Sequence, residues 1–289
     1  MSEADVARYR RDGFVAVPGL LDAAELEAIR VVIAEMVASA AEVDQNNEIY
    51  DLEIGHTRQA PRVRRIKTPH KVHKVFAQVV RKPKVTAVLQ ALLGQDIRLH
   101  GSKLNMKSAD YGSPVEWHQD WAFYPHTNDD LLAIGVMLDD MTLENGPLLV
   151  TPGSHNGKIW NHHSEDGRFC GCINPDEIAD EIAHAVPMTG RAGDMSFHHV
   201  RALHGSALNT SDRPRKLLLY EVAAADAWPL LHFTTLAEFD SRMLAGQPTL
   251  TPRLAPVPVR VPLPPALHQG SIYQNQLGAG RSYFRKAAA

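Results

Sequence analysis

In residues 1–95, the hydrophobic pattern predicts mostly helix. Residues 13–17 (Gly-Phe-Val-Ala-Val) form a short apolar run typical of a strand, and Asp22 follows where a helix N-cap is expected. Beyond it, apolar residues recur at three- and four-residue steps: Leu26, Ile29, Ile33 and Val37. This spacing gives one apolar face and predicts a helix packed on the core. A second such pattern, residues 85–93, ends at Gly94, a typical C-terminal stop.

From residue 96 onward the pattern changes to short runs typical of strands. These runs are residues 97–106, 131–138, 148–151, 195–197 and 216–222. Turn-forming residues separate them, among them Gly112-Ser113-Pro114 and Glu144-Asn145-Gly146-Pro147. Many short strands after N-terminal helices predict a mainly β protein with flanking α-helices, built as a barrel or a double-sheet jelly roll.

The length of 289 residues suits one globular domain. Within it we expect N-terminal helices over about 1–95, a jelly-roll core over about 96–225 and a C-terminal arm over about 226–289. Prolines gather between residues 252 and 265, which favours an extended arm on the surface. Residues 160–185 are polar and irregular, so we expect an insertion or lid there, with one short helix from Asp176 onward.

Composition and charge limit which partners and which cellular compartment we expect. The formal net charge of -3 gives no overall field that would attract nucleic acid or an anionic membrane. Residues 1–11 lack the order of a signal peptide, and no apolar run is long enough for a membrane span. Cys170 and Cys172 are too few and too close for a disulfide framework. We therefore expect a cytoplasmic protein with no nucleic-acid or membrane partner.

A candidate metal site begins at Trp117-His118-Gln119-Asp120. On an extended chain, positions i and i+2 point to the same side, so His118 and Asp120 can bind one metal ion. A second histidine from a distant strand would complete a facial triad of two histidines and one carboxylate on iron(II). We favour His204, because Gly205-Ser206 after it lets a co-substrate approach closely, over the neighbouring His198 and His199.

Arg215 stands at the head of the next β-rich run after His204 and can face the same site. Its guanidinium could form a bidentate pair with the distal carboxylate of 2-oxoglutarate, while the oxo-acid end of that molecule binds iron. The remaining coordination position is then open for dioxygen.

These residues resemble the phytanoyl-CoA dioxygenase-like family of iron(II)/2-oxoglutarate oxygenases. The resemblance spans most of the chain, from Tyr9-Arg10-Arg11-Asp12-Gly13-Phe14 through Trp117-His118-Gln119-Asp120-Trp121 to Arg215. It also includes Glu144-Asn145-Gly146-Pro147-Leu148, Pro152-Gly153-Ser154-His155, Gly193-Asp194 and His204-Gly205-Ser206. It implies a double-stranded β-helix and a reaction that turns 2-oxoglutarate and O2 into succinate, CO2 and an oxidised substrate.

The resemblance also implies roles for particular residues. His118, Asp120 and His204 match the iron ligands, and Arg215 matches the 2-oxoglutarate anchor. Further co-substrate contacts match Asn105, Gln119 and Ser206. The candidate substrate-binding residues are Lys103, which shares a strand face with Asn105, Arg65 of the basic stretch 58–84, and Trp121 and Tyr124 after the iron-binding segment. Because Asp120 is present, hydroxylation or desaturation is favoured over halogenation.

The substrate stays open at this point. An acyl-CoA, an amino acid and a secondary metabolite all suit such a family, and hydroxylation of an unactivated C–H bond is the expected chemistry. Two other functions remain to be weighed: a non-catalytic barrel that binds a metal or small molecule, and a cupin-type metalloenzyme that does not use 2-oxoglutarate.

Overall fold

Two antiparallel sheets form the centre of the molecule in the computed structural model, which describes residues 1–109, 112–231 and 234–284. The larger sheet has the order β1-β9-β6-β11-β4-β3-β2, with β12 also paired to β4. Its strands are β1 (Phe14–Val17), β2 (Tyr50–Leu52), β3 (Val63–Lys67), β4 (Ile97–Lys107), β6 (Leu131–Met137), β9 (Met195–His199), β11 (Arg215–Ala224) and β12 (Met243–Ala245). The smaller sheet has the order β5-β10-β7-β8. It consists of β5 (Val115–His118), β7 (Leu148–Val150), β8 (Val186–Met188) and β10 (His204–Ser206).

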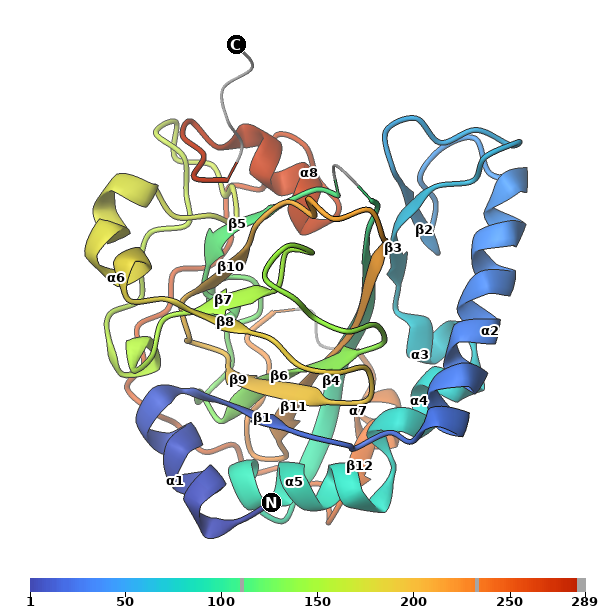
Figure 1. Cartoon of the computed structure of the whole chain (residues 1–289). Helices are drawn as coiled ribbons and strands as arrows, with labels where there is room; N and C mark the ends of the chain where they lie inside the picture. Colours follow the sequence, from blue (N-terminus) through green and yellow to red (C-terminus); the bar gives the residue numbers. More distant parts are fainter. Residues whose placement is uncertain (110–111, 232–233, 285–289) are drawn as a thin grey trace.

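The crossovers between these sheets make a double-stranded β-helix, or jelly roll, flanked by helices (Figure 1). The helices are α1 (Glu3–Asp12), α2 (Ala23–Ser39), α3 (Pro69–Val72), α4 (Lys74–Val80), α5 (Pro83–Leu93), α6 (Ala179–Ala183), α7 (Leu236–Ser241) and α8 (Ile272–Asn275). Short 3-10 turns are η1 (Ala40–Glu42), η2 (Asp120–Ala122), η3 (Ser154–Asn156), η4 (Pro175–Ile178) and η5 (Gln276–Gly278). The predicted mainly β architecture with flanking helices is confirmed.

Helix α2 forms where the sequence predicts it. The Asp22 side chain accepts a hydrogen bond from the backbone N–H of Glu25, whose carboxylate accepts one from the N–H of Asp22. This capping box satisfies amide groups that would otherwise lack partners at the helix start. The predicted apolar stripe is buried at Leu26, Ile29 and Ile33. These side chains join the main hydrophobic core on the helical side of the large sheet.

The two faces of the large sheet differ in chemistry. On β11, Leu218 and Tyr220 belong to the main hydrophobic core, whereas Arg215, Leu217 and Leu219 line a cavity inside the barrel. Strand β4 alternates in the same way: Leu104 and Met106 pack in the core, and Lys103, Asn105 and Lys107 face the cavity. The period-two pattern of a strand therefore places a row of polar side chains inside the barrel.

The C-terminal part differs from the expected extended arm. No helix or strand forms in residues 246–270, and the chain is fixed there by bonds such as that from the indole Nε1 of Trp121 to the carbonyl of Pro258, 2.9 Å. Before and after this stretch, however, α7, β12, α8 and η5 are regular elements. Figure 1 shows α8 back at the barrel, near β5 and β10. The contacts that hold α8 at the barrel join residues far apart in the chain, so the local sequence does not predict them.

The segment 160–185 contains η4 and α6, where one short helix was expected from Asp176. Within the described ranges, none of the helices has the length and apolar character needed to cross a membrane.

Candidate active site

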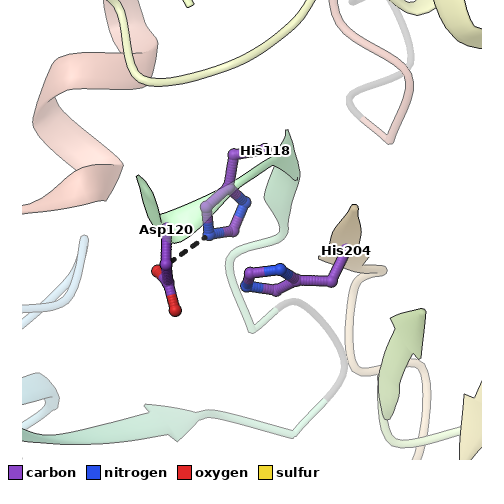
Figure 2. A group of neighbouring side chains, drawn as sticks. All are labelled: His118, Asp120 and His204. Atoms are coloured by element: carbon purple, nitrogen blue, oxygen red, sulfur yellow. Dashed lines mark ion pairs between the residues drawn. The ribbon is translucent and has the colours of Figure 1, made fainter. Parts of the chain in front are cut away.

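His118, Asp120 and His204 meet inside the barrel (Figure 2). His118 ends β5, Asp120 begins η2, and His204 begins β10 directly opposite His118 in the strand register. All three are buried, and one potential ligand atom from each lies within 4.8 Å of the others. The structure therefore brings together the three side chains that the sequence singled out as metal ligands.

Backbone carbonyls orient both imidazoles. The Nδ1 of His118 donates to the carbonyl of Glu116 at 2.8 Å, and the Nδ1 of His204 donates to that of Ala202 at 2.9 Å. The proton is therefore on Nδ1, and Nε2 keeps its lone pair, as histidine ligands commonly require. Burial lowers the pKa of His118 to about 4 and holds the pKa of His204 well below its usual value. Both rings are neutral at pH 7, which suits binding of a divalent cation.

The carboxylate of Asp120 is ionised. Burial alone would raise the pKa of Asp120, but the positive charge of Lys103 and the close contact with His198 outweigh it and hold the pKa well below the usual value. The donor set is thus two neutral imidazoles and one carboxylate, with Nε2 of His118 3.8 Å from Asp120 Oδ1. This set fits iron(II).

The two competing histidines occupy different places. The Nε2 of His198 lies 3.5 Å from Asp120 Oδ2, so His198 contacts the triad although it is not one of the three clustered ligands. His199 lies on the other face of β9, where its ring is 5.2 Å from that of His155. The clustering favours His204 over both as the third ligand.

A cavity beside the triad contains two buried cations, Lys107 and Arg215. They are register partners on β4 and β11. Burial and then Arg215 hold the pKa of Lys107 well below its usual value, and burial lowers the pKa of Arg215 to about 10. Among the described residues, no carboxylate forms an ion pair with either one. Uncompensated buried cations are costly, so this cavity is suited to an anionic ligand.

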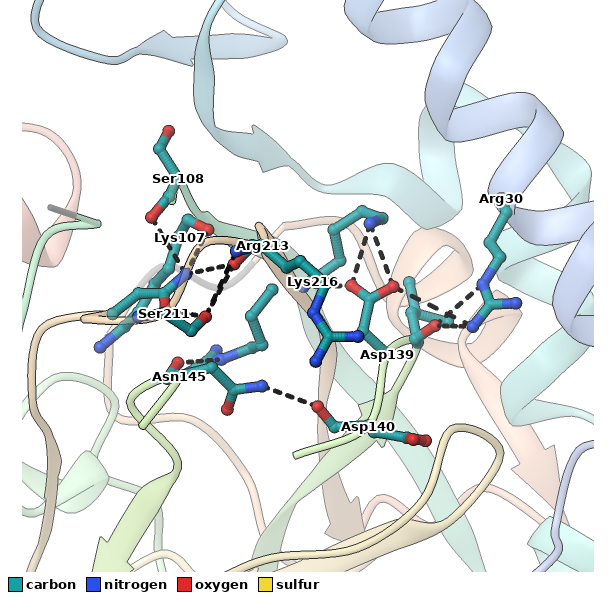
Figure 3. Close-up of polar contacts among 12 residues, drawn as sticks. Arg30, Lys107, Ser108, Asp139, Asp140, Asn145, Ser211, Arg213 and Lys216 are labelled. Atoms are coloured by element: carbon teal, nitrogen blue, oxygen red, sulfur yellow. Dashed lines mark hydrogen bonds and ion pairs between the residues drawn. The ribbon is translucent and has the colours of Figure 1, made fainter. Parts of the chain in front are cut away.

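The turn Glu144-Asn145-Gly146-Pro147 positions Arg215. The guanidinium donates to the carbonyls of Asn145 and Gly146, the first through Nε at 3.4 Å. The Asn145 side chain fixes the turn by donating to the carbonyl of Asp140 at 2.7 Å (Figure 3). It also accepts a hydrogen bond from the N–H of Thr142 at 3.0 Å. Gly146 has φ +69°, and a Cβ there would lie 2.5 Å from the carbonyl oxygen of Ala207.

Two of the three predicted secondary co-substrate residues face this cavity. Asn105 and Ser206 line it together with Arg215. The Ser206 hydroxyl accepts a hydrogen bond from Lys107 Nζ at 3.0 Å, and Asn105 has a buried Oδ1 without a partner. Both side chains therefore offer polar groups to a ligand.

Gln119 does not face the cavity, which corrects the prediction for this residue. Its side chain donates to the carbonyls of Lys158 and Arg201, at 3.2 and 2.9 Å, and accepts from the N–H of Trp160 at 2.9 Å. Because Gln119 lies between His118 and Asp120 along the chain, its side chain points away from theirs. Gln119 anchors the loop that follows Lys158.

A second cavity, of about 270 Å³, adjoins the first at Asp120. Of the predicted substrate residues, Arg65, Lys103 and Tyr124 line it. The two cavities share Lys103, Asp120 and Ile272. Trp121 is a correction: it is buried in a small apolar cluster with Leu131 and Val200 and lines neither cavity.

In the second cavity, Lys103 and Arg65 differ in their partners. Lys103 Nζ lies 3.0 Å from Glu221 Oε1, and Glu221 and Asp120 together outweigh burial and raise the pKa of Lys103. Arg65 forms no ion pair within the described ranges, and its Nε is buried without a hydrogen-bond partner. Arg65 is thus the cation of this cavity that remains available to a ligand.

Sequence reasoning missed two polar side chains of the first cavity, Lys107 and Tyr273. Lys107 follows Lys103 and Asn105 at the same two-residue step, so the strand rule that selected those two could also have found it. Tyr273 lies on α8, and no local pattern indicates that this helix returns to the barrel.

Comparisons with known proteins agree with this geometry. The family model described as phytanoyl-CoA dioxygenase (PhyH) matches residues 9–217. A protein of Stutzerimonas stutzeri named "Probable alpha-ketoglutarate-dependent hypophosphite dioxygenase" is 38% identical over 280 residues, which cover 96% of this chain and 97% of that protein. The L-proline trans-4-hydroxylase of Streptomyces griseoviridis is 33% identical over 233 residues, covering 73% and 82% of the two chains.

Among solved structures, EctD from S. alaskensis with bound Fe has a TM-score of 0.67 at 23% identity, covering 91% of this chain and 89% of that one. The carbocyclase SnoK from nogalamycin biosynthesis has a TM-score of 0.65 at 24% identity, with coverage of 86% and 93%. These likenesses support the jelly-roll fold. The family match, the two relatives and the buried triad lead to one conclusion: the chain belongs to the phytanoyl-CoA dioxygenase family and is an iron(II)- and 2-oxoglutarate-dependent dioxygenase.

Proposed function

We propose that His118, Asp120 and His204 hold the iron, and that Arg215 binds the distal carboxylate of 2-oxoglutarate. The observation that carries this proposal is the buried pair of cations, Lys107 and Arg215, in the cavity that the triad also lines. The lining of this cavity offers metal ligands and also positive charge without a carboxylate partner among the described residues. A dicarboxylate with a 2-oxo group matches both features.

The iron, when bound, supplies the chemistry that couples oxidation of the substrate to decarboxylation of 2-oxoglutarate. The protein supplies geometry. Arg215 and Lys107 hold the distal carboxylate, with Asn105 and Ser206 as further hydrogen-bonding groups. The apolar side chains Leu217 and Leu219 line the same cavity and exclude water from it. Lys103, held by Glu221, keeps a positive charge beside Asp120 at the boundary between the two cavities.

For the substrate, we propose a small anion bound in the second cavity by Arg65, beside the ion pair of Lys103 and Glu221. The cavity's volume of about 270 Å³ lies below the roughly 300–1,000 Å³ of pockets for drug-sized ligands, which argues for a small molecule. The relative that matches along nearly the whole chain is named for hypophosphite, a small anion, whereas the relatives named for proline and ectoine match about three quarters of it. Hypophosphite is therefore our first candidate.

This proposal replaces part of the expectation from sequence. None of the relatives above is named for an acyl-CoA, and with hypophosphite the oxidised bond would be P–H rather than an unactivated C–H bond. Insertion of one oxygen atom from O2 would turn hypophosphite into phosphite. The other atom would enter succinate as 2-oxoglutarate loses CO2.

The test is oxygen-dependent turnover of anaerobically iron(II)-loaded protein with 2-oxoglutarate. Hypophosphite, L-proline, ectoine and an acyl-CoA are supplied separately, and succinate and the oxidised product are measured. We expect succinate and phosphite in equal amounts with hypophosphite, and no product from His118→Ala. Stimulation by proline or ectoine alone would contradict the anion proposal while leaving the dioxygenase assignment intact.

The same experiment separates the two other functions considered from sequence. A non-catalytic barrel would bind iron and 2-oxoglutarate but release no succinate with any substrate. A cupin-type enzyme would act without 2-oxoglutarate. Such an enzyme would have no use for the pair formed by Lys107 and Arg215. Cytoplasmic location stays a prediction from Cys170 and Cys172, and cell fractionation tests it.

A further inference from the structure

The C-terminal segment 271–284 forms a wall of the co-substrate cavity. It lies beyond residues 9–217, which the family model matches. Ile272 and Tyr273 of α8 line the cavity together with Arg215 and Lys107. The cavity is therefore completed by a part of the chain that the family pattern does not include.

Several contacts fix this segment to β5, the strand that carries His118. The Glu116 carboxylate accepts a hydrogen bond from the N–H of Tyr283 at 2.8 Å. The buried Gln276 accepts from the N–H of Glu116 at 3.0 Å and donates back to its carbonyl at 3.4 Å. The ring of Phe284 stacks on that of Trp117, with centroids 5.9 Å apart. These contacts fix α8 over the cavity.

Tyr273 is the polar side chain that α8 contributes to the cavity. It is 2% exposed, and its hydroxyl is buried without a hydrogen-bond partner. The Arg64 guanidinium lies over the ring, 4.9 Å from its centroid. An unpaired buried hydroxyl costs free energy, so a ligand that accepts its hydrogen bond would recover that cost.

We propose that Tyr273 is a 2-oxoglutarate-binding residue whose hydroxyl donates a hydrogen bond to the distal carboxylate beside Arg215. This inference rests on the proposed co-substrate site. Arg215 and Lys107 come from the barrel strands, and Tyr273 approaches the same carboxylate from α8. Docking of segment 271–284 on β5 and binding of 2-oxoglutarate then support each other, because the ligand satisfies a hydroxyl that is otherwise unpaired.

The test compares Tyr273→Phe with wild type by anaerobic calorimetry on the full-length protein loaded with manganese(II) in place of iron. Titration with 2-oxoglutarate should give a dissociation constant on the order of 10- to 100-fold higher for Tyr273→Phe, the usual size of a lost hydrogen bond to a charged group. Oxalate, which can chelate the metal but has no distal carboxylate, should bind both proteins equally. Tyr283→Phe is the matched control, since Tyr283 is 51% exposed on the same segment and lines neither cavity.

Two results would overturn the inference. One is a 2-oxoglutarate affinity of Tyr273→Phe within about twofold of wild type. The other is an equal loss of affinity for oxalate, because Tyr273 would then support the fold of the site rather than bind the distal carboxylate. If wild type itself fails to bind 2-oxoglutarate, the co-substrate site as a whole is wrong, which is a separate outcome.

Discussion

Lys107 and Arg215 face each other across β4 and β11, and both side chains are buried in one cavity without a carboxylate partner among the described residues. Burial, and then the charge of Arg215, lowers the pKa of Lys107. Lys107 donates hydrogen bonds to Ser206, and Arg215 donates to the carbonyls of Asn145 and Gly146, but these partners carry no negative charge. We take the distal carboxylate of 2-oxoglutarate to be the carboxylate partner of Lys107 and Arg215, and this leads to the first prediction.

Arg215→Ala should weaken 2-oxoglutarate binding by about two to three and a half decades, because removing one partner of a buried ion pair costs roughly 3–5 kcal/mol. Lys107→Met should weaken it in the same direction. Calorimetry on metal-loaded protein measures both. Lys216→Met is the matched control, since Lys216 pairs with Asp139 at 2.9 Å and lines no part of this cavity. If the affinity of Arg215→Ala for 2-oxoglutarate is within threefold of wild type, Arg215 does not bind the distal carboxylate.

Asp120→Ala should lower iron(II) affinity by more than about 100-fold, because it removes an anionic ligand. His198→Gln should lower the iron(II) affinity by about tenfold, the usual loss when a residue that only orients a ligand is replaced. A competition titration with a coloured chelator reports both constants. Loss of iron as complete in His198→Gln as in Asp120→Ala would mean that His198 is itself a ligand.

Arg65→Met should raise the KM for an anionic substrate at least about tenfold, because a charge-assisted hydrogen bond contributes roughly 1.5–3 kcal/mol. The dissociation constant for 2-oxoglutarate should stay unchanged, since Arg65 lines the second cavity but not the first. Arg58→Met is the control: Arg58 also belongs to the basic stretch, but its guanidinium pairs with Asp44 on the surface. Equal KM values for the two variants would place the substrate elsewhere.

Gly146→Ala should destabilise the protein by about 1–3 kcal/mol and weaken 2-oxoglutarate binding. An alanine at φ +69° is strained, and its Cβ would press on the carbonyl oxygen of Ala207, so the turn that holds Arg215 would have to move. Urea unfolding and ligand titration measure the two effects. Gly167→Ala is a control: it has φ +80° but nothing within 4 Å of a new Cβ, so it should destabilise without weakening binding.

The protein should lose stability as the pH falls from about 6.5 toward 3. Burial lowers the pKa values of His126 and His162 to about 3, below the usual 6.5, so the unfolded chain binds protons in this window and the folded chain does not. His162 also accepts the N–H of Gln119 at 2.8 Å, which protonation would prevent. The urea midpoint should be lower at pH 5 than at pH 7.5, and the difference between the two midpoints should be smaller in His162→Gln. An unchanged midpoint would contradict the buried neutral state.

Much of the site followed from one local rule, the alternation of side chains along a strand. It places His118 with Asp120, and Lys103 with Asn105. The same rule excludes Gln119 from the cavity, because Gln119 lies between two ligands. The role that the resemblance to the family implied for Gln119 was therefore wrong, whereas strand geometry gives the correct orientation. The rule also predicts that Lys107 faces the cavity, because Lys107 follows Lys103 and Asn105 at the same two-residue step.

Other features could not be predicted, because they depend on contacts between distant parts of the chain. Trp121 leaves the strand pattern at η2 and packs against Leu131, a partner that no local spacing indicates. Tyr273 reaches the cavity only because Glu116 and Gln276 bond across a separation of 160 residues. Hydrophobic periodicity identifies which face of an element is buried, but it does not identify the partner.

The two cavities share Lys103, Asp120 and Ile272 as a common boundary. A ligand in one cavity therefore changes the surroundings of a ligand in the other through the same three side chains. The two binding equilibria should be thermodynamically coupled, and such coupling is reciprocal. Whatever factor 2-oxoglutarate contributes to the affinity for substrate, the substrate must contribute to the affinity for 2-oxoglutarate. If that factor raises the affinity, the enzyme holds its co-substrate most firmly when there is something to oxidise.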